Sequence, residues 1–352
     1  ILIEPTTGKV LVEQNSHVKL PPASVTKVMT ILLIYDAVHN GKINWDDIVT
    51  VSNHASSMGG SQIFLEPLEQ QTVHDLTKSI VIASANDAAV AMAEFIAGSE
   101  EGFVSMMNNK AKDLGINDTN FLNACGLDAD GHVTSSYDIA LMTKELVTKY
   151  PEVLEFSKVW QDVIYHKTAR GTQEFGLTNT NKLIKKYSGA TGLKTGSTSK
   201  ALYCLSGTAE RDGMGLIAVV LGAPDPAIRF DEVIKMFDYG FASYSLSQGE
   251  EKDTIVGNIN VMKGEEDTVD VAVKEKITVL VNKGNKKELE SHLEILPGLN
   301  APVAKGTKAG EIIYSFDGNE VGRSDLVTVS DVERAGLTRI MQKLLKEWFS
   351  VD

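Results

Sequence analysis

Ser24 and Lys27 lie three residues apart in the stretch PPASVTKVMTILLIYDAV, where an apolar, helix-forming segment begins. Side chains at positions i and i+3 of a helix share a face, so the hydroxyl and the amine are expected to meet. Burial of the lysine would disfavour its charged form and lower its pKa. A neutral amine beside a serine hydroxyl is a general base beside a nucleophile, with no histidine required. The alternative is a serine that only caps the helix.

Two further polar motifs follow in the chain. Ser84-Ala85-Asn86 interrupts an apolar stretch with helical spacing, and Lys194-Thr195-Gly196 directly precedes a β-rich run. S-x-x-K alone arises by chance in many chains, but S-x-x-K, S-x-N and K-T-G in this order form the signature of penicillin-binding proteins and class A β-lactamases. The chain has no G-x-S-x-G or H-E-x-x-H motif, and its seven histidines are scattered. Each histidine is therefore expected to be a surface or packing residue.

The elements that must position these motifs follow from apolar periodicity. Two strands are expected before residue 20, then a helix from about 24 to 38. Further helical segments are expected up to Gly98, from 99 to Gly115, and from a serine cap at 135 to just before Pro151. Two β-rich runs flank Arg211-Asp212-Gly213, which is a hairpin signal, and a helix follows from 227 to 244. Strands distant in the sequence are thus expected to share one sheet covered by helices.

The composition changes near residue 248, where the polar segment SQGEEKD begins. Short β runs separated by turns follow and predict a small all-β domain at 250–329. The tail 330–352 has the spacing of a basic amphipathic helix, which suits a membrane interface; docking on the β domain or in a partner's groove is the alternative. Its apolar positions are Leu337, Ile340, Met341, Leu344, Leu345, Trp348 and Phe349, and its basic ones are Arg339, Lys343 and Lys346.

Charge and composition narrow the possible functions of the 352-residue chain. A net charge of −13 argues against nucleic acid as the main partner. No apolar run approaches the ~20 residues needed to span a bilayer. The chain opens on what looks like a strand already under way, so we expect that an N-terminal segment such as an export signal has been removed. Cys125 and Cys204 are expected to be free thiols, with one disulfide as the alternative.

The amino-acid sequence around the motifs resembles that of the low-molecular-mass penicillin-binding proteins, which are serine-type D-alanyl-D-alanine carboxypeptidases. The resemblance covers essentially the whole chain. It implies an α/β (α+β) penicillin-recognising transpeptidase or β-lactamase-like domain at 1–247, with an antiparallel sheet flanked by helices and a helical subdomain. The small β-rich domain and amphipathic tail match the family's layout. The segments that carry the resemblance are TGKVLVEQN, PPASVTKVMT, MGGSQIFL, SANDAAVAMAE, NACGLDADGH, NTNKLI and GLKTGST.

The resemblance also implies a role for each motif residue. Ser24 would be the acylated nucleophile, Lys27 its base, and Ser84 a relay of a proton to the leaving amine. Asn86 would bind the substrate amide, and Lys194 and Thr195 the terminal carboxylate. Backbone N–H groups of Ser24 and Ser197 would form the oxyanion hole. Gly196 would let the strand edge approach the substrate.

The implied reaction is removal of the terminal D-alanine from peptidoglycan stem pentapeptides through an acyl-enzyme, without metal or cofactor. β-Lactams would be covalent inhibitors. The implied location is the bacterial envelope, at the outer face of the cytoplasmic membrane, with the C-terminal helix on the membrane surface.

Two departures from the family pattern stand out. Leu68 replaces a turn glycine, so the loop 66–69 is expected to differ in shape. Arg229 could assist carboxylate binding, but an ion pair with Asp231, Glu232 or another acid is the favoured expectation.

Three alternatives remain open. A class A-like β-lactamase needs a glutamate for deacylation, and the segment 115–131 where it would lie contains none. A peptidoglycan endopeptidase would differ only in pocket shape. A non-enzymatic peptidoglycan-binding scaffold would be expected to have lost at least one of the motif residues.

Overall fold

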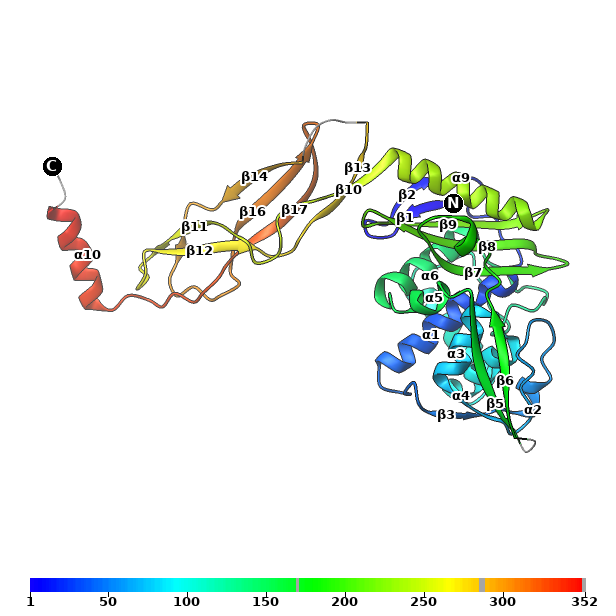
Figure 1. Ribbon diagram of the computed structural model, residues 1–352. Helices are drawn as coiled ribbons and strands as arrows, with labels where there is room; N and C mark the ends of the chain where they lie inside the picture. The colour runs from blue at the N-terminus through cyan, green and yellow to red at the C-terminus, as the bar shows by residue number, and fades with distance from the viewer. Residues whose placement is uncertain (169–170, 285–288, 350–352) are drawn as a thin grey trace. The chain divides into compact units, whose positions relative to one another are not determined.

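The computed structural model describes residues 1–168, 171–284 and 289–349 and divides the chain into two compact units, Ile1–Ala242 and Ser243–Asp352. The first unit holds a five-stranded antiparallel sheet with the order β2-β1-β9-β8-β7 (Figure 1). Its strands are β1 (Leu2–Glu4), β2 (Lys9–Val12), β7 (Ala190–Thr198), β8 (Leu202–Arg211) and β9 (Met214–Ala223). The N-terminal strands β1 and β2 therefore share one sheet with strands that lie about 200 residues later in the chain, as expected.

The expected hairpin lies between β8 and β9. Arg211 pairs with Met214, so the loop contains only Asp212 and Gly213. Both have positive φ, +51° and +74°, as a two-residue type I′ turn requires. The Arg-Asp-Gly signal is thereby confirmed.

Helices cover both faces of this sheet (Figure 1). On one face lies α9 (Pro226–Ser243), whose Gly240 packs directly on Leu2 and Leu216. On the other face, Thr143 of α6 (Ser136–Lys149) shares a hydrogen bond of 2.7 Å with Ser206 of β8. The expected antiparallel sheet flanked by helices is confirmed.

The helical subdomain is built around α1 (Lys27–His39), which is buried on every side from Lys27 to Tyr35. A helix that is apolar all round belongs in the interior of a domain. The remaining elements of this unit are η1 (Ala23–Thr26), β3 (Ile48–Thr50), α2 (Asn53–Ser56), β4 (Gln70–Thr72), α3 (Val73–Ile82), α4 (Asn86–Ala97), α5 (Glu100–Asp113), α7 (Val153–Ser157), β5 (Gln161–Thr168), β6 (Gly171–Thr178) and α8 (Leu183–Lys186).

One helix prediction was wrong in an informative way. The apolar stretch ending at Gly98 is two helices, α3 and α4, separated at Ala83–Ala85. Ser84 has a φ of +62°, a left-handed conformation that interrupts a right-handed helix. Buried residues continue on both sides of the break, at Leu76–Ile82 and at Asn86–Ala93, so apolar periodicity alone could not reveal it.

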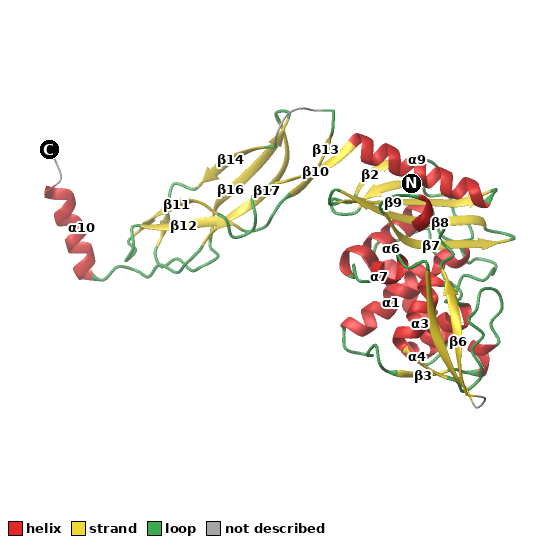
Figure 2. Ribbon diagram, in the orientation of Figure 1, coloured by secondary structure: helices red, strands yellow, loops and turns green. Residues whose placement is uncertain are grey.

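In its described residues, the second unit consists of strands and loops apart from α10 (Leu337–Phe349) (Figure 2). A six-stranded sheet has the order β14-β16-β17-β12-β11-β15, and a separate pair joins β10 (Tyr244–Gln248) to β13 (Thr278–Asn282). The other bounds are β11 (Ile255–Met262), β12 (Thr268–Val273), β14 (Glu290–Ile295), β15 (Leu299–Asn300), β16 (Lys308–Phe316), β17 (Asn319–Thr328) and α10 (Leu337–Phe349). In the described part of the chain, no helix has both the length and the hydropathy to cross a bilayer.

Leu68 has a left-handed backbone conformation, the kind that glycine adopts most easily. Its φ is +66°, its side chain is 79% exposed, and its N–H donates to the carbonyl of Val51 at 2.8 Å. The left-handed region costs a residue with a Cβ roughly 1–2 kcal/mol, whereas glycine enters it freely. The backbone at Leu68 is therefore locally strained.

We predict that Leu68→Gly raises the free energy of unfolding of the first unit by about 0.5–1 kcal/mol, the strain relief exceeding the entropic cost of glycine. Thermal and urea unfolding followed by circular dichroism would measure this. Leu122→Gly is the control, because Leu122 is also a partly exposed loop leucine but lacks a positive φ, and this variant should be destabilised. A destabilised Leu68→Gly protein would contradict the strain argument.

Candidate active site

Ser24 lies in η1, the short 3-10 helix that leads into α1. The residue before it, Ala23, has a φ of +49°, so the backbone is strained next to the serine. No side chain caps η1 or α1. The Ser24 hydroxyl instead receives a hydrogen bond from the Lys27 amine, 3.0 Å away. The simple capping role considered for Ser24 is therefore wrong.

The Lys27 amine is fully buried and lies within hydrogen-bond distance of three oxygens. These are Ser24 Oγ at 3.0 Å, Asn86 Oδ1 at 2.6 Å and the Cys125 carbonyl at 2.7 Å. Burial lowers the pKa of Lys27 to about 8, against a smaller opposing effect of nearby negative charge that includes Asp87. With this pKa, about a tenth of the amine is neutral at pH 7 and about half at pH 8, far more than for an exposed lysine.

The three oxygens differ in what they can do. The amide oxygen of Asn86 and the carbonyl of Cys125 only accept hydrogen bonds, whereas the serine hydroxyl can also donate. A neutral amine has two N–H groups and one lone pair. When the two N–H groups go to Asn86 and Cys125, the lone pair faces the Ser24 hydroxyl, which is the geometry for removing its proton.

The second lysine, Lys194 on β7, is also buried, with 1% of its surface exposed. Its amine donates to Ser84 Oγ at 2.8 Å and to the Thr195 carbonyl at 3.1 Å. Burial, followed by the positive charges of Lys27 and Arg229, holds its pKa well below the usual range. The left-handed turn at Ser84 directs the hydroxyl between α3 and α4 toward β7.

The start of α4 also organises the loop that precedes β4. Asn86 Nδ2 donates to the Gly59 carbonyl at 2.7 Å, and Asp87 accepts the backbone N–H groups of Ile63 and Leu65 at 3.1 Å each. Because the other atom of the same amide, Asn86 Oδ1, accepts from Lys27, one side chain links this loop to the buried amine.

The K-T-G strand lies against the serine turn. A Cβ added to Gly196 would come within 2.9 Å of the backbone nitrogens of Ser24 and Val25, so only glycine fits there. Ser197, the next residue, is exposed. Thr195 Oγ1 donates to Thr180 Oγ1 at 2.7 Å. Thr180 was not assigned a role from the sequence, although the NTNKLI segment that contains it belongs to the family text.

Arg229 does not form the ion pair that was favoured from the sequence. Its guanidinium turns toward the sheet, where Nη1 donates to the carbonyls of Gly196 and Cys204 at 3.0 and 3.2 Å. Among the described residues, no acid forms an ion pair with Arg229, and Glu232 pairs with Lys235 instead. Residue 229 lies on the buried side of α9, which removes its side chain from the neighbouring acids.

The two cysteines are free and buried, as expected. His132 is a packing residue that contacts the serine turn: its Nε2 lies 2.8 Å from Thr26 Oγ1, and its Nδ1 accepts the Leu122 N–H at 2.9 Å. Burial lowers the pKa of His132 to about 4, so the ring is neutral at physiological pH. In the described part of the chain, no cluster of three metal-ligating side chains occurs.

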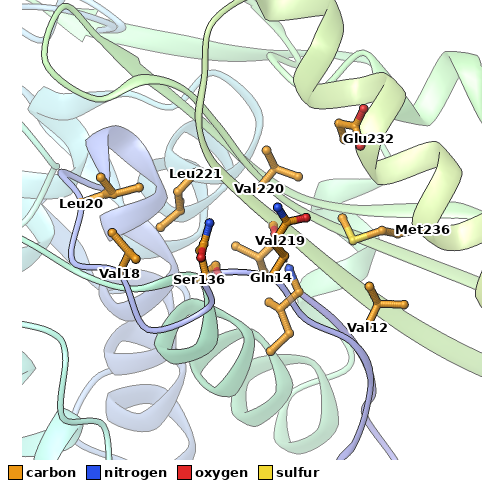
Figure 3. A pocket seen from close by; sticks show the side chains of 12 residues that line it. Val12, Gln14, Val18, Leu20, Ser136, Val219, Val220, Leu221, Glu232 and Met236 are labelled. Carbon is orange, nitrogen blue, oxygen red and sulfur yellow. Dashed lines mark hydrogen bonds between the residues drawn. The ribbon is translucent and has the colours of Figure 1, made fainter.

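A cavity of about 430 Å³ lies elsewhere in this unit, between the N-terminal strands and α9 (Figure 3). None of the motif residues lines it. Its walls are mainly apolar and include Val18, Leu20, Val220 and Met236. It is therefore distinct from the cluster of motif residues.

A serine hydroxyl beside a buried amine, on a helix packed against an antiparallel sheet, defines a serine enzyme that acts by acyl transfer. Comparison with known sequences identifies the family within this class of enzymes. Residues 1–225 match the family described as D-alanyl-D-alanine carboxypeptidase, and residues 244–334 match the C-terminal domain of penicillin-binding protein 5. The chain belongs to the D-alanyl-D-alanine carboxypeptidase family.

Individual relatives agree with this assignment. The chain is 42% identical to the D-alanyl-D-alanine carboxypeptidase DacF of Bacillus subtilis, covering 99% of this chain and 89% of the relative. It is 34% identical to DacC of Escherichia coli, covering 96% and 84%. The crystal structure of penicillin-binding protein 5 from Haemophilus influenzae matches with a TM-score of 0.79 at 30% identity, covering 95% of this chain and 96% of that one. The protein is thus a serine-type carboxypeptidase, and its fold is the penicillin-recognising one.

A role of Lys27 as the base for Ser24 predicts a pH dependence for acylation. Only the neutral amine can accept the Ser24 proton, so the rate should increase with pH through about 8. Below that value it should fall about tenfold per pH unit. Stopped-flow acylation by a chromogenic β-lactam between pH 6 and 10 would measure this. A rate that is constant from pH 6 to 8 would contradict the assignment of Lys27 as the base.

Proposed function

We propose that Ser24 is the nucleophile of this carboxypeptidase and Lys27 its general base. The observation that carries the proposal is the position of the Lys27 amine, which is buried between two acceptor-only oxygens and lies 3.0 Å from the serine hydroxyl. In the first step, Ser24 Oγ loses its proton to Lys27 and attacks the carbonyl carbon of the penultimate D-alanine. Backbone N–H groups of Ser24 and Ser197 stabilise the oxyanion.

Collapse of the tetrahedral intermediate breaks the C–N bond and expels the terminal D-alanine. Its amine receives a proton from Ser84, whose hydroxyl is held by Lys194 at 2.8 Å. Lys27 returns the serine's proton to this relay, so the protons balance. Water then attacks the acyl-enzyme, releasing the shortened stem peptide and restoring Ser24.

Substrate binding falls to the residues around β7. Lys194 and Thr195 bind the terminal carboxylate, which supplies the counter-charge that Lys194 lacks among its described contacts. Gly196 admits the peptide to the strand edge, and Asn86 binds the substrate amide through its Nδ2. Arg229 donates a hydrogen bond to the Gly196 carbonyl and adds positive charge to this region.

We further propose a division into a catalytic domain at 1–247, a β-rich domain at 250–329 and a membrane-associated helix at 330–352. The enzyme would then act at the outer face of the cytoplasmic membrane, near its peptidoglycan substrate. Exposed apolar side chains on α10 support this: Leu337, Met341 and Leu345 are each at least half exposed. The side chains of Lys343, Leu344, Lys346, Trp348 and Phe349 lie outside those that the structure describes.

The nucleophile is tested by intact-mass spectrometry after brief exposure to penicillin G. Wild-type protein should gain one penicilloyl group and Ser24→Ala none. The control Ser56→Ala, at a partly exposed serine on α2, should gain one group as in the wild type. Ser24→Ala should also release D-alanine from a pentapeptide at least about 10³-fold more slowly. A stable adduct on the Ser24→Ala protein would contradict the proposal, and rapid penicillin turnover without an adduct would favour the β-lactamase alternative.

The membrane role is tested by co-sedimentation with vesicles containing anionic lipid. Met341→Glu with Leu345→Glu should reduce the bound fraction at least about tenfold, because two charges on the apolar face oppose insertion. The control Lys343→Gln with Lys346→Gln lowers the net charge by the same two units at positions opposite the apolar stripe. At high ionic strength, which screens the attraction to anionic lipid, it should bind more strongly than the first variant. Equal binding by the two double variants would contradict the proposal.

A further inference from the structure

The turn at residues 123–127 is held by a single side chain. Asn123 Oδ1 accepts the backbone N–H groups of Gly126 at 2.7 Å, Leu127 at 3.2 Å and Cys125 at 3.3 Å. Its Nδ2 donates to the Leu127 carbonyl at 2.9 Å. Both ends of the turn are therefore tied to one amide, in a segment that is neither helix nor strand.

This turn carries one of the two acceptors for the Lys27 amine. The Cys125 carbonyl projects from it and receives the Lys27 hydrogen bond at 2.7 Å. The acceptor is a backbone atom, so the Cys125 side chain cannot place it; the conformation of the turn does. The side chain with the most hydrogen bonds to that turn is Asn123.

The turn also packs against the strained backbone beside the nucleophile. Gly126 has a φ of +87°, and a Cβ added there would lie 1.9 Å from the Ala23 carbonyl oxygen. Cys125 is fully buried. The turn therefore both covers Lys27 and contacts the segment that presents Ser24.

We propose that Asn123 is a positioning residue for the base: it holds the Cys125 carbonyl where it accepts one N–H of Lys27, so that the lone pair faces Ser24. This inference rests on the proposed role of Lys27 and adds a residue that does not itself contact substrate. The resulting chain of contacts runs from Asn123 through the turn and the Cys125 carbonyl to the amine.

Loss of the Asn123 amide has two expected effects. The Lys27 amine loses a fixed acceptor, so its lone pair is directed at Ser24 less often and acylation slows at every pH. The loosened turn also admits water to Lys27. Since burial is the main cause of its low pKa, hydration raises that pKa, and the acid limb of the rate profile moves to higher pH.

The test compares acylation rates by a chromogenic β-lactam over pH 6–10 in full-length variants. Asn123→Ala should acylate at least about tenfold more slowly, with its acid limb at higher pH than in the wild type. Asn108→Ala is the matched control. Asn108 holds the same loop two residues upstream, accepting from the Phe121 N–H and donating to the Phe121 carbonyl, both at 2.9 Å. It should lower the melting temperature but leave the acid limb unmoved.

Asn123→Asp keeps the oxygen that accepts the three N–H groups. At pH 10, where Lys27 is largely neutral, it should acylate within about threefold of the wild type, and Asn123→Ala should still be slow. A wild-type rate and profile in Asn123→Ala would overturn the proposal, as would an equal loss in Asn108→Ala. If Asn123→Ala does not fold, a folded but slow Asn123→Asp overturns the proposal, and a fast one supports it. Failure of the proposed function can be distinguished from failure of this inference by mass spectrometry. If the proposed function were wrong, the penicilloyl group of the wild-type protein would not lie on Ser24.

Discussion

The burial of the Lys27 amine is the constraint on which the site depends. A lysine placed among the apolar side chains of α1 loses most of its hydration, and the protein compensates with three oxygens rather than with a carboxylate. A carboxylate would have restored the positive charge and raised the pKa. Uncharged partners leave the amine able to take a proton, as the proposed mechanism requires of the base beside Ser24.

Three separate elements converge to satisfy that amine. Ser24 comes from η1, Asn86 from the first residue of α4, and Cys125 from a turn before α6. Two of the segments concerned contain residues other than glycine in left-handed backbone, Ala23 and Ser84. Such residues cost of order 1–3 kcal/mol each and persist only where surrounding packing holds them. Here that packing is the interior of the first unit, in which α1 is buried from Lys27 to Tyr35.

The sequence predicted the parts of the site that depend on side-chain identity. Ser24 and Lys27 were paired from their spacing, and the two other motifs from their order in the chain. The sheet, the hairpin at Asp212-Gly213 and most helices followed from periodicity. The break at Ser84 did not, because apolar spacing continues across it and the left-handed residue is a serine rather than a glycine.

Contacts that depend on backbone atoms or on the direction of a side chain were beyond the sequence. The acceptor at Cys125 is a backbone carbonyl, which every residue type carries, so the sequence does not indicate it. Arg229 was expected to pair with nearby acids because they are close in sequence, but its helix position turns it toward β7 and β8. The strain at Leu68 is likewise a backbone property, since its side chain is exposed and contributes little packing.

The central claim is that the Lys27 amine is largely neutral at slightly alkaline pH. Titration of the lysine ¹³Cε resonances by NMR, with Lys27 assigned by its absence in Lys27→Arg, measures this directly and without a substrate. The account predicts a pKa of about 8. A value near 10.4, that of an exposed lysine, would contradict it.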